Sequence, residues 1–261
     1  MEQSARPVAL FAALEAEALA LVRHLTPSTR PSPRLSVWAG VIEGTPVVLV
    51  VTGVGKVAAA LAAQFVCDVF HPRCAITFGL AGGTDSSAQP GHLIVASGAL
   101  QHDMDARPLT DARGTIPSLG LAAIAADSNI SARLRQAAES VVENPAIVSS
   151  GLVLTGDQVI TSREIRDGVL KDFPDGACFD METAAIAQVA LQNGIPWAAL
   201  RMISDSADES FNLEEVIGFG IDTAAGLFDS IVRACLGASS SAPPSTWPGV
   251  AVGKAEGRDD V

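Results

Sequence analysis

Three acidic residues are the first candidates for chemistry, because each stands where an apolar segment begins or ends. Asp205 follows the apolar run Trp197–Ile203, Glu182 opens an apolar helical run, and Glu17 lies in the first turns of a helix. Partial burial of Asp205 would raise the pKa of its carboxyl group, and a raised pKa suits a general acid. Each acid also has a structural explanation, as a turn residue (Asp205), a favourable charge at a helix N-terminus (Glu182) or a solvated side chain (Glu17).

Two glycine-rich segments and one polar pair are weaker candidates. GLAGG at Gly79–Gly83 would let backbone amides approach a ligand closely, although a tight turn explains it equally well. TGVGK at 52–56 is not a phosphate-binding P-loop, because it lacks the four-residue gap and the hydroxyl residue after Lys56. Neither segment matches the dinucleotide fingerprint. His102-Asp103 is either a functional pair or a structural one.

The elements that must position these residues follow from apolar periodicity. The predicted strands are Val8–Leu14, Leu35–Glu43, Pro46–Thr52, Cys74–Phe78, His92–Ser97, Ile147–Leu154 and Trp197–Ile203. The predicted helices are Glu15–Leu25, Lys56–Phe70, Ser131–Val142, Ser162–Lys171, the run from Glu182 to Asn193, and Leu213–Leu236 with a bend near Gly218 and Gly220. The segment Gln101–Gly120 is predicted to be a loop. This alternation predicts an α/β fold of three layers, in which helices flank a central mixed, largely parallel twisted sheet.

The candidate residues should meet at one edge of that sheet. In open α/β sheets, ligands bind at the carboxyl ends of the strands. Glu17 comes after the first strand, GLAGG after Phe78, TGD after Leu154 and SDSAD after Ile203. We therefore predict that these strand ends form one pocket.

The size of the chain suits one globular domain. Of 261 residues, 48% are apolar and 18% are charged. We assign residues 7–236 to a single domain and residues 1–6 to a flexible N-terminus. Residues 237–261 are rich in Ser, Pro, Gly and charge, and we expect a disordered tail there.

Charge and cysteine content limit the partners and the compartment. The formal net charge of −12 argues against binding to nucleic acid or to an anionic membrane surface. The four cysteines lack CxxC spacing and have apolar neighbours, so we expect reduced thiols, a cytoplasmic protein and no zinc site. No stretch of about 20 residues suits a bilayer.

Six short segments, in order along the chain, resemble the nucleoside phosphorylase/nucleosidase superfamily. They are AALEAE (12–17), TGVGKVAAA (52–60), TFGLAGG (77–83), LTGDQ (154–158), FDMETAAIA (179–187) and RMISDSAD (201–208). The block M-E-x-x-A-x-A followed by S-D is the specific part. Within the superfamily the chain most resembles the 5′-methylthioadenosine/S-adenosylhomocysteine nucleosidases, over roughly residues 8–236.

The resemblance implies hydrolysis of the N-glycosidic bond of a 5′-substituted adenosine, a reaction of methionine salvage. In that reaction Asp205 protonates N7 of the leaving purine, and Glu17 positions and deprotonates water. Glu182 hydrogen-bonds the ribose hydroxyls, Met181 packs against the sugar, and Ser204 orients Asp205. The purine lies along the segment Gln158, Val159 and Ile160. The resemblance further implies a nucleoside as the small-molecule partner, a homodimer, and no metal or other cofactor.

Two departures from the family pattern concern the substrate. Gln158-Val159-Ile160 stands where adenine-specific members usually present an aromatic ring, and Leu80 stands where a small polar residue is common. Losing a stacking ring could weaken adenine binding by roughly 1 kcal/mol. Hydrolysis of futalosine-type or other nucleosides, and a non-catalytic nucleoside-binding protein, therefore stay open as alternatives.

A purine nucleoside phosphorylase is a further alternative. Phosphorylases need arginines to hold the phosphate dianion. The segment AALEAEA lacks the glycine-and-arginine phosphate loop of that branch, and Thr77-Phe78, not an arginine, stands directly before GLAGG. Water is therefore the favoured nucleophile.

Overall fold

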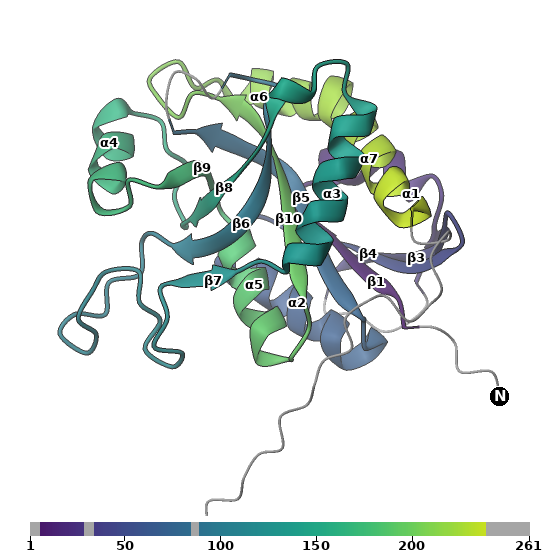
Figure 1. The fold of residues 1–261 in the computed structure, drawn as a ribbon, viewed down its shortest axis with the longest axis horizontal. Coiled ribbons are helices and arrows are strands. Elements are labelled where there is room, and N and C mark those ends of the chain that lie inside the picture. The colour runs from purple at the N-terminus through teal and green to yellow at the C-terminus, as the bar shows by residue number, and fades with distance from the viewer. Residues whose placement is uncertain (1–5, 29–33, 85–88, 239–261) are drawn as a thin grey trace, which may run out of the picture.

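The computed structural model describes residues 6–28, 34–84 and 89–238 (Figure 1). The predicted flexible N-terminus, apart from Arg6, and the predicted disordered tail, apart from its first two residues, lie outside the described residues. Both stay predictions.

Helices and strands alternate along most of the chain. The strands are β1 Val8–Ala12, β2 Thr26–Pro27, β3 Ser36–Ile42, β4 Thr45–Val51, β5 Cys74–Gly83, β6 Leu93–Gln101, β7 Ala123–Ala125, β8 Val148–Thr155, β9 Gly176–Asp180 and β10 Trp197–Asp205. The α-helices are α1 Glu15–Val22, α2 Lys56–Phe70, α3 Ser128–Val141, α4 Arg163–Asp172, α5 Thr183–Gln192, α6 Leu213–Phe219 and α7 Ala225–Gly237. A 3₁₀ turn (Pro145–Ile147) precedes β8, and a π-helical turn (Gly220–Ala224) joins α6 to α7.

The sheet is mixed, as predicted. Strand β1 lies between β4 and β5 and is parallel to both. Strands β3 and β4 are antiparallel and joined by a tight turn in which Gly44 has a φ of +74°, which confirms the predicted pair. Beyond β5, the pairings run through β10, β6, β8 and β9, and β9 pairs with β5 again. This circuit brings the ends of β5, β9 and β10 close to one another.

Helices cover both faces of the sheet, which confirms the predicted layered α/β class (Figure 1). Helices α2 and α5 pack on one face through small side chains such as Ala59, Ala63 and Ala184. Helices α1, α3 and α7 pack on the other face through larger residues such as Leu134 and Phe228. None of the helices in the described part of the chain is long and apolar enough to cross a membrane.

Several element boundaries differ from those predicted. Strand β9 was not predicted, because its apolar pattern is only five residues long and runs directly into the segment before α5. Strand β5 continues through GLAGG to Gly83, so these glycines belong to the strand and do not follow it. Small residues also allow β8 and β9 to lie close together, since a Cβ at Gly151 of β8 would lie 2.2 Å from the Cβ of Ala177 in β9. The helix predicted over Leu213–Leu236 is divided by the π-helical turn, close to the expected bend.

Candidate active site

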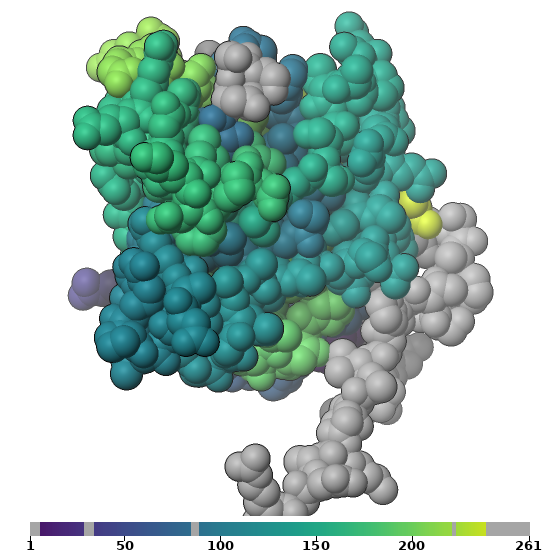
Figure 2. All heavy atoms as spheres, turned by 60° about the vertical axis from the view of Figure 1, so that its left-hand side comes forward, coloured from purple at the N-terminus to yellow at the C-terminus, as the bar shows by residue number. Residues whose placement is uncertain are grey.

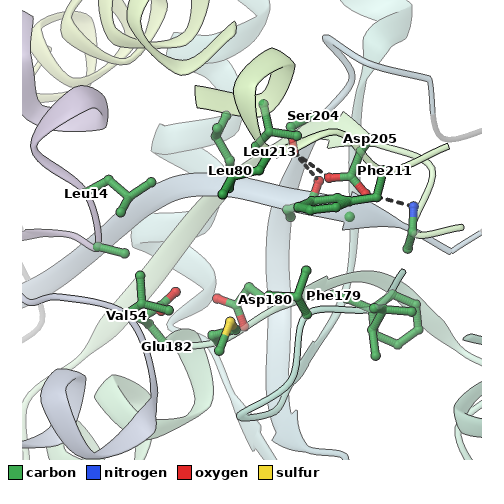
Figure 3. A pocket seen from close by; sticks show the side chains of 18 of the residues that line it. Leu14, Val54, Leu80, Phe179, Asp180, Glu182, Ser204, Asp205, Phe211 and Leu213 are labelled. Atoms are coloured by element: carbon green, nitrogen blue, oxygen red, sulfur yellow. Dashed lines mark hydrogen bonds between the residues drawn. The ribbon is translucent and has the colours of Figure 1, made fainter. Parts of the chain in front are cut away.

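One pocket lies where β1, β5, β9 and β10 end (Figure 3). The nine residues that the sequence nominated all line it: Glu17, Leu80, Gln158, Val159, Ile160, Met181, Glu182, Ser204 and Asp205. The other residues that line it are Ala13, Leu14, Val54, Ala81, Gly82, Phe179, Asp180, Ala207, Phe211, Leu213 and Val216. The pocket is open to solvent on one side, and its cavity volume is about 180 Å³.

Glu17 is fixed in the pocket by the turn between β1 and α1. Its Oε2 accepts hydrogen bonds from the backbone N–H groups of Ala13 and Leu14, both at 2.9 Å, and its Oε1 accepts one from Leu80 at 2.8 Å. The residue is only 3% exposed. Burial raises the pKa of this carboxyl group, against the lowering effect of the hydrogen bonds and of Arg201. A buried carboxyl group with a raised pKa, held in one orientation, is suited to accept a proton.

The first glycine of GLAGG explains how Glu17 reaches β5. A Cβ at Gly79 would lie 2.7 Å from Oε1 of Glu17 and 2.4 Å from Nη1 of Arg201. Any other residue would push both side chains away from the strand. Glycine is therefore needed at position 79 so that Glu17 and Arg201 can pack against the strand, and not because of a positive φ.

Glu182 stands at the N-cap of α5, across the pocket from Asp205 (Figure 3). Its Oε1 accepts a hydrogen bond of 2.9 Å from the backbone N–H of Gly55, in the TGVGK segment. Burial, and then the negative charge of Asp180, raise the pKa of Glu182 to about 8, while Arg201 and the Gly55 N–H act in the opposite direction. Gly55 has a φ of +100°, so the turn that supplies this donor requires glycine.

A buried ion pair lies beneath the two glutamates. Arg201 is 1% exposed and its Nη2 lies 2.8 Å from Oδ2 of Asp180. Thr183 accepts hydrogen bonds from Arg201 and donates to Asp180, and the hydroxyl of Thr155 donates to the other carboxylate oxygen at 2.5 Å. This network was not predicted from the sequence. An arginine inside the apolar run Trp197–Ile203 was the signal available, because a buried charge needs a partner.

Asp205 ends β10 and is held differently. Its Oδ2 accepts a hydrogen bond from Ser204 Oγ and its Oδ1 accepts one from the backbone N–H of Ala207, both at 2.8 Å. Burial raises the pKa of this half-buried carboxyl group, although both hydrogen bonds lower it. Gly82 lies opposite Asp205 in the β5–β10 register, and a Cβ there would come within 3.4 Å of Asp205 Oδ1 and 3.0 Å of the Ala207 Cβ.

The aromatic rings of the pocket do not come from the segment after TGD. Val159 is half-exposed there and Ile160 is buried. The ring of Phe179 packs edge-on against His102, with centroids 5.8 Å apart, whereas Phe211 lies on the wall that carries Asp205 (Figure 3). His102 is thus part of the packing behind the pocket, and Asp103 pairs with Lys56.

The arrangement suits cleavage of a bond that needs an acid on one side and a base on the other. Asp205 with Ser204 occupies one wall, and Glu182 with Asp180 occupies the opposite wall (Figure 3). Glu17 belongs to the Glu182 side, because it lies close to Arg201, the ion-pair partner of Asp180. Glycosidic cleavage uses two carboxyl groups in this way. Within the described residues, no group of three or more His, Cys, Asp and Glu side chains is placed to hold a metal ion.

Comparisons with known proteins agree over most of the chain. The model of the phosphorylase superfamily matches residues 7–236. The 5′-methylthioadenosine/S-adenosylhomocysteine nucleosidase of Anoxybacillus flavithermus is 33% identical over 79% of this chain and 88% of its own length. The corresponding enzyme of Neisseria meningitidis, solved with methylthio-immucillin-A, superposes with a TM-score of 0.82 at 29% identity, over 89% of this chain and 99% of that one. The enzyme of Colwellia psychrerythraea, solved with adenine, superposes with a TM-score of 0.81 at 30% identity, over 90% of this chain and 96% of that one.

Proposed function

This chain belongs to the phosphorylase superfamily, and we propose that it acts there as a nucleosidase that hydrolyses the N-glycosidic bond of a 5′-substituted adenosine. The predicted family is thereby confirmed. The named relatives act on methylthioadenosine and S-adenosylhomocysteine, which supports substrates of that type. The observation that carries the proposal is the gathering of Glu17, Glu182 and Asp205 around one pocket.

Asp205 supplies the proton that the leaving base needs. Its pKa is raised by burial, so a larger fraction of the enzyme holds the proton near neutral pH. Ser204 and Ala207 fix the two carboxylate oxygens, and the proton is delivered to N7 of the purine. Protonation lets the base leave as a neutral molecule.

Glu17 binds the attacking water and takes its proton. Three backbone N–H groups hold the carboxylate in one place, and its raised pKa makes it a stronger base than an exposed glutamate. Positioning of this kind lowers the entropic cost of bringing water to the sugar.

Glu182 binds the ribose hydroxyls and Met181 packs against the sugar, while Gln158, Val159, Ile160 and Leu80 contact the rest of the nucleoside. The carboxyl group of Glu182 retains acceptor capacity beyond its bond to Gly55, which hydroxyl donors can fill. The sugar then lies between the two acidic walls.

Water is a better candidate nucleophile than phosphate. The described residues that line the pocket include no lysine or arginine, and Arg201 is engaged by Asp180 beneath it. Binding a phosphate dianion would require such cations.

The same resemblance supports a homodimer that acts in methionine salvage. Cytoplasmic location is supported by the four cysteines, none of which is in a disulfide within the described residues.

Base release tests the proposed function. The purified chain is incubated without phosphate with methylthioadenosine, S-adenosylhomocysteine, inosine or aminodeoxyfutalosine, and the free base is quantified. We expect adenine from the first two. Release only after phosphate is added would show a phosphorylase, and tight binding without release over hours would show a binding protein.

A further inference from the structure

We propose that Lys56 is a positioning residue for sugar recognition. Together with Asp103 and Asp157 it forms what we call the Lys56 clasp, which holds the turn whose Gly55 N–H orients Glu182. The inference rests on the proposed function, because it requires Glu182 to bind the ribose.

The clasp joins three segments that are far apart in the sequence. Lys56 Nζ lies 2.6 Å from Asp103 Oδ1, and the backbone N–H of Asp157 donates to Asp103 Oδ2 at 2.9 Å. The backbone N–H of Lys56 donates to Asp157 Oδ1 at 2.7 Å. The clasp thus ties TGVGK, His102-Asp103 and TGD together, three motifs for which the reaction itself gives no role.

The ion pair at its centre is partly shielded from solvent. The side chains of Lys56 and Asp103 are 17% and 32% exposed. Partial burial raises the pKa of Asp103, but the hydrogen bonds from Lys56 and Asp157 outweigh it and lower the pKa overall, so Asp103 is ionised at neutral pH. Salt screens such a pair less than a fully exposed one.

The clasp and Glu182 are linked through two consecutive peptide groups. The N–H of Gly55 donates to Glu182, and the N–H of the next residue, Lys56, donates to Asp157. Both groups belong to the start of α2, so a rotation that breaks one contact displaces the other. The turn is made flexible by Gly53 and Gly55, both with positive φ, and external contacts must therefore fix it.

The Gly55 N–H is the donor that orients Glu182, because the charges around this residue act in opposite directions. Asp180 and Glu17 disfavour the charged form of Glu182, and Arg201 favours it. Within the described residues, the Gly55 N–H is the donor found to hydrogen-bond the carboxyl group of Glu182. Loss of the clasp should therefore impair the contacts of Glu182 with hydroxyl groups.

The clasp is partly open to solvent, since the side chains of Asp103 and Asp157 are 32% and 47% exposed. Figure 2 shows the segment around residues 101–120, to which Asp103 belongs, in blue-teal below α4 in green. A purely structural ion pair there would affect all substrates equally. A positioning role predicts an effect that depends on the ribose hydroxyls.

The test compares Lys56→Met, Lys56→Arg and the wild type on methylthioadenosine and on its 2′-deoxy and 3′-deoxy analogues. Glu182→Gln first identifies the analogue that lacks the hydroxyl Glu182 contacts. We expect Lys56→Met to lower kcat/KM about 10-fold or more on the riboside, the scale of one hydrogen bond to a charged group, and less than about threefold on that analogue. Lys56→Arg should recover most of the loss. Equal losses on both substrates, or none, would overturn the proposal.

A second readout needs no turnover. Amide hydrogen exchange in peptides covering residues 52–58 should be about 10-fold faster in Lys56→Met and in Asp103→Asn than in the wild type. The matched control is Arg135→Met, which removes an exposed ion pair with Glu139 and should change neither readout. A wild type that releases no base would refute the proposed function, whereas unchanged exchange would refute the clasp, so the two failures are distinguishable.

Discussion

The two acidic walls of the pocket are built in different ways. Glu17 and Glu182 are almost fully buried, accept hydrogen bonds from backbone N–H groups, and lie over the Arg201–Asp180 pair. Asp205 is half-buried and is held by its neighbour Ser204 and by a turn in which Ala207 has a φ of +49°. One wall is therefore fixed by long-range contacts and the other by local ones.

This difference matches the two tasks of the reaction. Placing water against a sugar carbon demands precise geometry, which a buried network provides. Delivering a proton requires the acid to stand within hydrogen-bond reach of the leaving base, and here hydrogen bonds from Ser204 and Ala207 hold the two carboxylate oxygens of Asp205. Ala207 is non-glycine in the left-handed region, and strain of this kind is often found at functional sites.

The largest expected effect on turnover comes from removing the proton donor, Asp205. Asp205→Asn keeps the size of the side chain but cannot deliver the proton, so turnover of methylthioadenosine should fall ~10²–10⁴-fold, the range for a lost general acid. Steady-state kinetics measure the loss. An unchanged kcat would remove Asp205 from the mechanism.

The buried wall should dominate stability. Arg201→Met leaves the charge of Asp180 buried without a partner, which costs about 3–5 kcal/mol of the free energy of unfolding. Urea denaturation compares it with Arg233→Met, which removes an exposed pair with Glu43 and should cost less than about 1 kcal/mol. Similar midpoints for the two variants would contradict this assignment.

Glu182, on the buried wall, should make the free energy of unfolding fall as pH rises. The pKa of Glu182 in the folded state is about 8, well above its ordinary value, so the folded protein binds more protons than the unfolded chain between these two values. Stability from this group is complete at low pH and is lost as pH rises through about 8, by on the order of 2–4 kcal/mol. Glu182→Gln should flatten the dependence of the unfolding free energy on pH from 5 to 8.5. An equally steep dependence in that variant would show that another group is responsible.

A smaller effect, on adenine affinity, concerns the wall that carries Asp205. If Phe211 provides the ring that Val159 does not, Phe211→Leu should weaken binding of free adenine by about 1 kcal/mol, or roughly fivefold. Calorimetry with adenine measures this without any contribution from the sugar or its 5′ substituent. Leu213→Ala, on the same wall, is the control and should change adenine affinity less.

The sequence was informative where a local pattern carries the signal. Apolar periodicity indicated most strands and helices, and the strand ends nominated Glu17 and Asp205, which the fold brings to the same pocket. It was uninformative where contacts join distant segments. The bond from Gly55 to Glu182 spans 127 positions, and Arg201 meets Asp180 only because β10 and β9 both flank β5. No local propensity encodes such pairings, since they depend on the sheet order.

The proposed mechanism gives two residues separate roles: Asp205 protonates the leaving base, and Glu17 activates the attacking water. The most direct test replaces adenine by 4-nitrophenolate in the same 5′-methylthioriboside, because this leaving group needs no proton. The account predicts that Asp205→Asn then retains turnover within about tenfold of the wild type, whereas Glu17→Gln still loses ~10²-fold or more. Equal losses in both variants with this substrate would contradict it.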